Sequence, residues 1–313
     1  MNLLILGSLA QEFATLIARR TSEVKISLAP NYGSEMDKAA PQTERILGYL
    51  LPEKLLKRAE KLRWIQLMSA GVDQLLSSPY LRDDVLITTA RGVHSPQMAE
   101  YVLGAMVALA RNFPQMVRNQ SEHIWKQWTG TTLAGKTLGL VGFGAVGAEI
   151  ARLARAFSMK VIGLRKSGQP HPLAEVMYGP ERLGRLLHAS DFVVLAVPLT
   201  AESQNLIGPI QLKLMKRTAF LINISRGGVL DHDALIRSLE KGELAAAVLD
   251  VFEEEPLAKG SPLWKTPNLF LTPHISGLSQ EYVAKVTDIF LANLQCLKKG
   301  EPLINPVDRR RGY

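Results

Sequence analysis

A glycine loop, Gly142-Phe143-Gly144-Ala145-Val146-Gly147, constrains the fold of this chain more than any other feature. It directly follows the apolar run 138–141 and directly precedes the helical pattern 148–154. In a strand–turn–helix unit, such glycines allow a tight turn, close approach of the backbone to a pyrophosphate, and close packing of helix on strand. The phosphates then lie at the helix N-terminus. The segment predicts a dinucleotide-binding unit, and a glycine-rich turn without a ligand is the alternative.

Apolar runs of strand length alternate with helical patterns along most of the chain. The stronger series of runs is 138–141, 160–164, 192–197, 219–223, 246–249 and 269–271, and a weaker series is 3–6, 26–28, 46–51, 64–67 and 85–88. Runs that are apolar throughout are typical of strands covered on both faces. The alternation predicts an α/β fold with parallel sheets. Helices are expected over 96–111, over 231–241 with Asp231 as cap and Gly242 as stop, and over 280–299.

Lys and Arg outnumber Asp and Glu by 37 to 29, which gives a formal net charge of +8. This excess is compatible with nucleic acid, an acidic membrane surface or a small anionic ligand as partner. No nucleic-acid recognition motif accompanies the charge. Uncharged stretches such as 137–148 are shorter than the roughly 18 apolar residues that cross a bilayer. We therefore expect a small anion, and neither nucleic acid nor a membrane.

Cys296 is the only cysteine, so neither an intramolecular disulfide nor a cysteine-based metal cluster can form. No pair of His or Cys residues has the spacing of metal ligands, and no metal is expected. The cysteine count favours a reducing, cytoplasmic setting. The apolar start, 1–7, lacks a preceding basic region and is interpreted as a first β-strand rather than a signal peptide.

The residues after the run 160–164 bear on the choice of dinucleotide. An acidic residue about 20 positions after the glycine loop normally bonds the adenosine ribose and selects NAD. This chain has Arg165, Lys166 and Ser167 there, without a carboxylate. Two cations can bind a 2′-phosphate, which a carboxylate would repel. The sequence favours NADP(H); the alternative is that both cations are ordinary loop residues and that NAD binds.

Three further segments follow the later strands: 223–228, 250–256 and 272–277. Ligands of open α/β sheets bind at the carboxyl ends of the strands. One cation, one carboxylate and one imidazole that converge on a nicotinamide are the minimum set for the reduction of a 2-oxo acid. The segments supply these three groups.

In their order and spacing, the glycine loop and these three segments resemble the D-isomer-specific 2-hydroxyacid dehydrogenase family. The resemblance extends to 67–73, to Ala99-Glu100 and to 261–264. The missing acidic residue and the ending 307–313 are similar to bacterial NADPH-dependent glyoxylate/hydroxypyruvate reductases. The resemblance implies two doubly wound parallel-sheet domains: a Rossmann cofactor domain, 98–277, inserted into a flavodoxin-like substrate domain, 1–97 with 278–313.

The resemblance also implies the catalytic roles. Arg226 would hold the substrate carboxylate and polarise the 2-oxo group. His274 would donate a proton to the oxygen as hydride arrives at C2. Glu255 would hydrogen-bond His274, orient its ring and keep it protonated near neutral pH. A solvated acidic turn for Glu255 and a structural histidine for His274 are the alternatives.

Binding residues follow from the same resemblance. The substrate carboxylate would also meet the backbone amides of Ala70, Gly71 and Val72, and Asp250 would approach the nicotinamide amide. The expected cofactor-binding residues are Gly142, Gly144, Ala145, Val146, Gly147, Arg165, Lys166, Ser167, Val197, Pro198, Ile224, Ser225, Asp250 and Gly277.

The segment 112–129 resembles the dimerisation arm of the family. Trp125 and Trp128 are then interface anchors of a homodimer, although two tryptophans beside a lysine could also be a stacking platform for nucleic acid.

The expected function is the NADPH-dependent reduction of small 2-oxo acids, glyoxylate and hydroxypyruvate first, to 2-hydroxy acids. An NAD-dependent D-2-hydroxyacid dehydrogenase for a bulkier acid is the first alternative. A catalytically silent, dinucleotide-sensing interaction protein is the second. The substrate side chain beyond C2 depends on loops near Tyr49, Leu50 and Leu51 and stays open.

Overall fold

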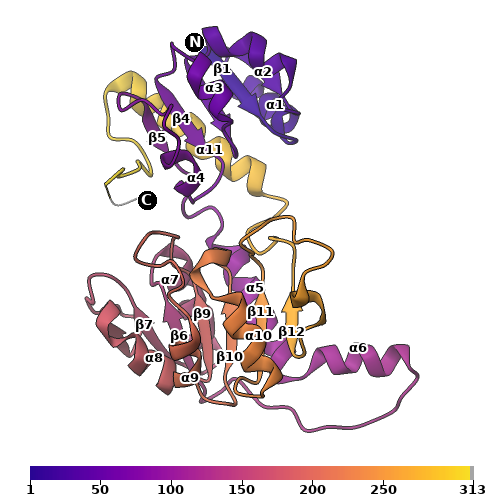
Figure 1. Ribbon diagram of the computed structural model, residues 1–313. Coiled ribbons are helices and arrows are strands. Elements are labelled where there is room, and N and C mark those ends of the chain that lie inside the picture. Colours follow the sequence, from indigo (N-terminus) through magenta and orange to yellow (C-terminus); the bar gives the residue numbers. More distant parts are fainter. Residues whose placement is uncertain (311–313) are drawn as a thin grey trace. The chain divides into compact units, whose positions relative to one another are not determined.

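A computed structural model describes residues 1–310, which form two compact units (Figure 1). Unit 1 combines Met1–His94 with the segment that begins at Ser279, and unit 2 is Ser95–Leu278. These limits lie within three residues of the domain boundaries expected after 97 and 277. The last three residues of the family-like ending, 311–313, lie outside the described part. The assignment of the units as substrate and cofactor domains stays a prediction.

Unit 1 contains a parallel five-stranded sheet. Its strands are β1 (Asn2–Leu6), β2 (Lys25–Ala29), β3 (Arg45–Gly48), β4 (Trp64–Leu67) and β5 (Leu86–Thr88). They lie in the order β2-β1-β3-β4-β5. This is the doubly wound order of flavodoxin-like folds, with its switch point between β1 and β3. The expected fold class of this part of the chain is confirmed.

Helices cover both faces of this sheet. Alternate side chains of a strand point to opposite faces, and from Leu3 to Leu6 in β1 the side chains on both faces are apolar and buried. The helices are α1 (Ala10–Arg20), α2 (Ser34–Ala39), α3 (Glu53–Arg58), α4 (Asp73–Leu76) and α11 (Tyr282–Lys299). Leu3 and Ile5 of β1 pack in one core with α1 and α11. Leu4 and Leu6 pack in the other core with α2 and α3. The expected helix 280–299 thus returns to the first sheet.

Unit 2 contains a parallel seven-stranded sheet. Its strands are β6 (Thr137–Val141), β7 (Lys160–Leu164), β8 (Val176–Tyr178), β9 (Phe192–Leu195), β10 (Phe220–Asn223), β11 (Ala246–Leu249) and β12 (Leu269–Leu271). The order β12-β11-β10-β9-β6-β7-β8 places the switch point between β6 and β9, as in Rossmann folds. Strand β8, a three-residue strand at the edge of the sheet, was not expected.

The helices of unit 2 also form two layers. They are α5 (Ser95–Ala110), α6 (Phe113–Ser121), α7 (Ala145–Ala156), α8 (Leu183–Ala189), α9 (Pro209–Leu214) and α10 (His232–Glu240). Helices α5 and α7 share a core with Leu138 and Leu140. Helices α8, α9 and α10 cover the other face. As predicted, Asp231 caps α10, where its carboxylate accepts the Ala234 N–H at 2.8 Å, and Gly242 follows the helix with φ of 62°.

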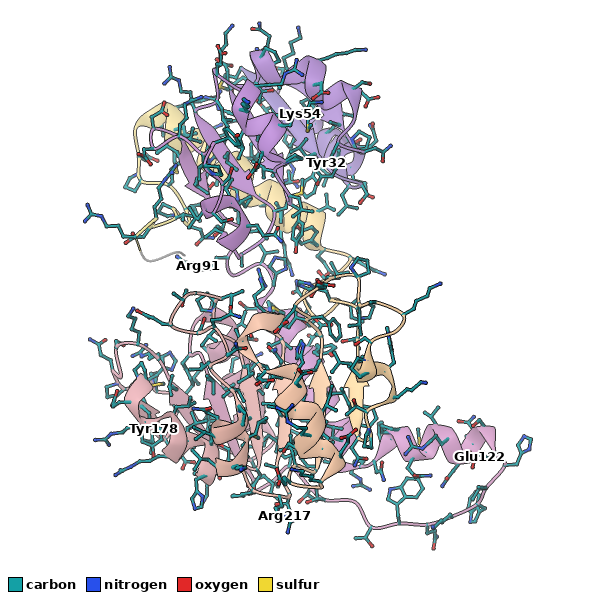
Figure 2. The ribbon with its side chains drawn as sticks, in the orientation of Figure 1. Tyr32, Lys54, Arg91, Glu122, Tyr178 and Arg217 are labelled. Atoms are coloured by element: carbon teal, nitrogen blue, oxygen red, sulfur yellow. The ribbon has the colours of Figure 1, made fainter. Side chains whose placement is uncertain are left out.

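Helix α6 and the loop behind it extend away from the rest of unit 2 (Figure 1). Glu122, directly after α6, lies near the far end of this arm (Figure 2). None of the helices described between residues 1 and 310 combines the length and apolar character that a membrane crossing needs.

Candidate active site

The segments 223–228, 250–256 and 272–277 follow β10, β11 and β12, which are neighbours in one parallel sheet. The carboxyl ends of parallel strands lie at the same edge of a sheet. The structure therefore brings the loops of Arg226, Glu255 and His274 to one edge of unit 2. Gly227 and the Phe252 backbone are in close contact, because a Cβ on Gly227 would lie 2.0 Å from the Phe252 carbonyl carbon.

His274 and Glu255 form the central polar pair of this edge. Nδ1 of His274 lies 2.7 Å from Oε2 of Glu255. Oε1 of Glu255 accepts the backbone N–H of Phe252 at 2.9 Å. Both side chains of the pair are 34% exposed. The Glu255 carboxylate thus links the imidazole ring of His274 to the backbone. Nε2, the second ring nitrogen, is not part of this contact.

The backbone of His274 has the left-handed conformation, with φ of 54°. Residues other than glycine adopt it rarely, and histidine is among those enriched there. The His274 N–H donates to the carbonyls of Asp250 at 2.9 Å and Thr272 at 3.0 Å. The chain around it therefore holds this conformation.

Asp250 anchors the loop after β12. Its side chain is fully buried. The carboxylate accepts the Thr272 hydroxyl at 2.6 Å and the backbone N–H groups of Ile275 and Ser276 at 2.9 Å each. The expected approach of Asp250 to a nicotinamide amide stays a prediction, and the anchoring contacts were not anticipated.

Arg226 is half-buried in the loop after β10, three residues beyond the end of the strand. Its Nη1 donates to the Ser225 carbonyl at 2.8 Å. Asn223 shapes the turn: its side-chain oxygen accepts the N–H and the hydroxyl of Ser225, and its amide donates to the Arg226 carbonyl. Local polar contacts thus hold the guanidinium group and its backbone at the edge of the sheet.

The glycine loop combines two close backbone approaches with one open position. Gly142 has φ of 103°, and a Cβ there would lie 2.5 Å from the Ala196 carbonyl oxygen. A Cβ on Gly147 would lie 2.4 Å from the Gly142 carbonyl oxygen. By contrast, a Cβ on Gly144 would meet no atom within 4 Å. Gly144 begins α7 without a side-chain cap, so the N-terminal N–H groups of this helix suit a pyrophosphate.

The remaining predicted cofactor residues lie at the same edge of the sheet. Ala145 and Val146 begin α7, Val197 and Pro198 follow β9, Ile224 and Ser225 follow β10, and Gly277 lies in the loop after β12. The predicted substrate loop, Ala70, Gly71 and Val72, follows β4 in unit 1, where the Ser69 hydroxyl donates to the Gly71 carbonyl at 2.8 Å. Its contact with the substrate stays a prediction.

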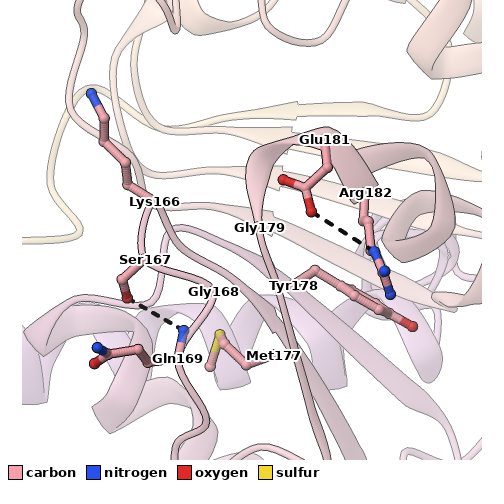
Figure 3. A pocket seen from close by; sticks show the side chains of 9 residues that line it. All are labelled: Lys166, Ser167, Gly168, Gln169, Met177, Tyr178, Gly179, Glu181 and Arg182. Atoms are coloured by element: carbon pink, nitrogen blue, oxygen red, sulfur yellow. Dashed lines mark hydrogen bonds and ion pairs between the residues drawn. The ribbon is translucent and has the colours of Figure 1, made fainter.

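The loops after β7 and β8 border a shallow surface pocket of about 360 Å³. Lys166, Ser167 and Gln169 line it from one side and Arg182 from the other (Figure 3). Arg165 is not among the lining residues; its guanidinium group donates to the carbonyls of Gln169 and Pro170 at 2.6–3.0 Å. Nζ of Lys166 lies 2.9 Å from the exposed carboxylate of Glu202. Of the two cations predicted to bind a 2′-phosphate, Arg165 thus bonds to carbonyls of its own loop, whereas Lys166 lines the pocket and pairs with Glu202.

The chain is similar to known proteins in both sequence and fold. Residues 103–276 match the model of the family described as "D-isomer specific 2-hydroxyacid dehydrogenase, NAD binding domain". The chain is 37% identical over 257 residues to a glyoxylate reductase of Korarchaeum cryptofilum, which covers 79% of this chain and 76% of that protein.

Two solved structures show the same fold along the whole chain. A D-isomer specific 2-hydroxyacid dehydrogenase family protein of Aeromonas salmonicida matches with a TM-score of 0.91 and 34% identity, over 98% of this chain and 99% of that one. An NADPH-dependent glyoxylate/hydroxypyruvate reductase of Sinorhizobium meliloti, solved with NADP and sulfate, matches with a TM-score of 0.90 and 25% identity, over 100% and 99%.

Proposed function

Because the chain belongs to the D-isomer specific 2-hydroxyacid dehydrogenases, a family of NAD(P)-dependent oxidoreductases, we propose that it reduces small 2-oxo acids, glyoxylate and hydroxypyruvate first, with NADPH. The observation that carries the proposal is the 2.7 Å contact between His274, in the loop after β12, and Glu255, in the loop after β11. Arg226 lies in the loop after β10, which is the neighbour of β11 in the sheet. A proton donor and an anion-binding cation at one sheet edge are what the reduction of a 2-oxo acid requires.

The residues present fit a dinucleotide. The open backbone at Gly144 and the uncapped N-terminus of α7 would hold the pyrophosphate. The loops after β9 and β10, with Val197 and Ser225, would line the rest of the cofactor site. When bound, the reduced nicotinamide supplies the hydride that C2 of the substrate accepts.

Arg226 binds the substrate in this proposal. Its planar guanidinium group can form two parallel hydrogen bonds with the substrate carboxylate and the 2-oxo oxygen. Positive charge beside that oxygen stabilises the negative charge that develops on it during reduction.

His274 donates its proton to the 2-oxo oxygen, which becomes the hydroxyl of the product. Glu255 accepts a hydrogen bond from Nδ1 and orients the ring. In the oxidative direction, the neutral ring takes the proton from the hydroxyl. The pair therefore acts as one proton-transfer unit in either direction.

NADP(H) is the proposed cofactor. Lys166, Ser167 and Arg182 line the pocket after β7 and β8 together with Glu181, whose carboxylate lies 3.8 Å from Nε of Arg182. A 2′-phosphate would take the place of this carboxylate beside Arg182, and two cations suit a phosphate. An NAD-dependent dehydrogenase for a bulkier acid is the second candidate. It is favoured by the three hydrogen bonds of Arg165 to carbonyls of its own loop, which leave this side chain with fewer donors for a phosphate.

We also propose a homodimer formed through the arm of α6 and the loop behind it. Phe113, Met116, Val117, Ile124 and Trp125 on this arm are all exposed, and Trp125 is 95% exposed. Several large apolar side chains that are exposed on one arm of a single chain are typical of a protein interface. Light scattering of the purified protein is expected to give twice the 34.5 kDa of one chain.

A cytoplasmic location stays a prediction.

The activity is tested by mixing the purified protein with NADPH and a panel of 2-oxo acids of increasing size. Loss of nicotinamide absorbance with glyoxylate or hydroxypyruvate, and formation of the 2-hydroxy acid, are expected. Absorbance loss only with NADH and a larger acid would favour the second candidate. No absorbance loss with any acid and either cofactor would contradict both.

A further inference from the structure

Two side chains of α5 hold the segment that carries His274. Nε2 of Gln97 donates to the carbonyl of Gly277 at 3.1 Å. The hydroxyl of Tyr101 lies 2.6 Å from Oγ1 of Thr272. Residues four apart in a helix lie on the same face, one turn from each other. The two contacts therefore hold both ends of the segment 272–277, with His274 between them.

The direction of the hydrogen bonds from Tyr101 follows from the chemistry of the partners. An ionised carboxylate only accepts hydrogen bonds, so the single hydroxyl proton of Thr272 goes to Asp250. Oγ1 of Thr272 is then left to accept the proton of the Tyr101 hydroxyl. Burial, with a smaller effect of the nearby Asp250 carboxylate, raises the pKa of Tyr101 to about 12. Tyr101 thus stays a donor at neutral pH.

Asp250 transmits this restraint to His274. Its carboxylate accepts the N–H groups of Ile275 and Ser276, and its carbonyl accepts the N–H of His274. A fully buried carboxylate depends on its donors, because no water replaces a donor that is lost. The Thr272 donor is itself oriented by Tyr101, so the hydroxyl of Tyr101 affects the backbone on both sides of the imidazole.

We propose that Tyr101, acting through Thr272 and Asp250, is a positioning residue for His274, and that Gln97 assists it at the other end of the segment. The inference rests on the proposed role of His274 as proton donor. A small displacement of a reacting group has a large effect on rate, because proton transfer requires a defined donor–acceptor geometry. The left-handed backbone of His274 depends on such external restraint.

Tyr101→Phe tests the proposal because it removes only the hydroxyl and keeps the ring, which packs on the core beneath α5. We expect kcat for the 2-oxo acid to fall about tenfold, while KM for acid and cofactor stays within about twofold. The isotope effect on kcat with deuterated NADPH is expected to rise as the chemical step becomes slower. Tyr80→Phe, at an exposed tyrosine of unit 1, is the matched control and is expected to behave as wild type.

Thr272 supplies a second, independent variant pair. Thr272→Val removes the hydroxyl and is expected to lower kcat at least as much as Tyr101→Phe. Thr272→Ser keeps the hydroxyl and is expected to retain most of the wild-type kcat. Because Tyr101 acts through Thr272, Tyr101→Phe should cause no further loss in the Thr272→Val background. Additive losses, or a Thr272→Ser variant as slow as Thr272→Val, would contradict the proposed order of contacts.

Hydrogen–deuterium exchange of the segment 272–277 separates this inference from the proposed function. Faster exchange of this segment in Tyr101→Phe, with wild-type exchange elsewhere, is expected whether or not the protein reduces a 2-oxo acid. An inactive wild type with this exchange pattern would reject the proposed function and keep the positioning of the loop. Unchanged exchange together with an unchanged kcat would overturn the inference.

Discussion

Glu255 accepts two hydrogen bonds at once: from the ring of His274, with 2.7 Å between Nδ1 and Oε2, and from the backbone N–H of Phe252, with 2.9 Å to Oε1. Each carboxylate oxygen therefore has its own donor. The second contact fixes the carboxylate against the backbone, so the imidazole is oriented by a group that cannot turn freely.

Glu255→Gln is expected to lower kcat by about 10- to 100-fold. A glutamine has one acceptor oxygen for the two donors, so one of them loses its partner, at a cost of about 1–3 kcal/mol. Steady-state kinetics at neutral pH measures the effect. Glu254→Gln changes the neighbouring exposed carboxylate and serves as the control. A Glu255→Gln enzyme with kcat within twofold of wild type would show that the carboxylate does not assist proton transfer.

Arg226→Lys is expected to raise KM for the 2-oxo acid by about tenfold or more and to lower kcat. Lysine keeps the charge but cannot form two parallel hydrogen bonds with a planar carboxylate. Titration of the acid at saturating cofactor measures both constants. Arg217→Lys, on the surface of unit 2, is the control. An unchanged KM would exclude Arg226 as the substrate-binding cation.

Lys166→Ala is expected to lower the preference for NADPH over NADH, as the ratio of the two kcat/KM values, by about tenfold. The ammonium group would lose a charge-assisted hydrogen bond to the 2′-phosphate, which NADH lacks. Lys213→Ala, at an exposed lysine of α9, controls for the loss of one surface charge. If wild type prefers NADH, or the ratio does not change, the cofactor assignment is wrong.

His232 is expected to make folding stability depend on pH. Burial lowers its pKa, against the opposing effect of the nearby Glu253, Asp231 and Asp233 carboxylates. The unfolded chain then binds the proton first as pH falls below the ordinary value of about 6.5, so the stabilisation present above that pH is lost. Nε2 of His232 is buried without a hydrogen-bond partner in the described part of the chain.

His232→Leu is therefore expected to lose less stability than wild type between pH 7.5 and 5.5, measured as the urea midpoint by circular dichroism. His188→Leu, at an exposed histidine of α8, is expected to keep the pH dependence of wild type. Equal losses for wild type and His232→Leu would exclude His232 as the titrating group.

Local patterns predicted most of the fold. The strands, the cap at Asp231 and the glycine loop depend on neighbours in sequence, and the structure has them where they were expected. Strand β8, a three-residue strand at the edge of the sheet, was missed. Two expected strands end earlier than predicted: 46–51 ends at Gly48 and 192–197 ends at Leu195.

The site was predicted less completely, since much of it depends on contacts between distant residues. The motifs indicated which loops meet at the sheet edge, and His274 and Glu255 are paired there. The network that holds His274 joins Tyr101 to Thr272, 171 positions away, and no local pattern reveals it. The direction of the Arg165 side chain, toward its own loop, was equally beyond a reading of sequence.

The role of His274 as proton donor is tested most directly by the rate of 2-oxo acid reduction by His274→Asn compared with wild type, both saturated with NADPH. We expect kcat to fall by about 10²- to 10⁴-fold, because no group remains to protonate the oxygen, while NADPH titrated by fluorescence binds with unchanged affinity. A His274→Asn enzyme that reduces glyoxylate or hydroxypyruvate at the wild-type rate would contradict this role.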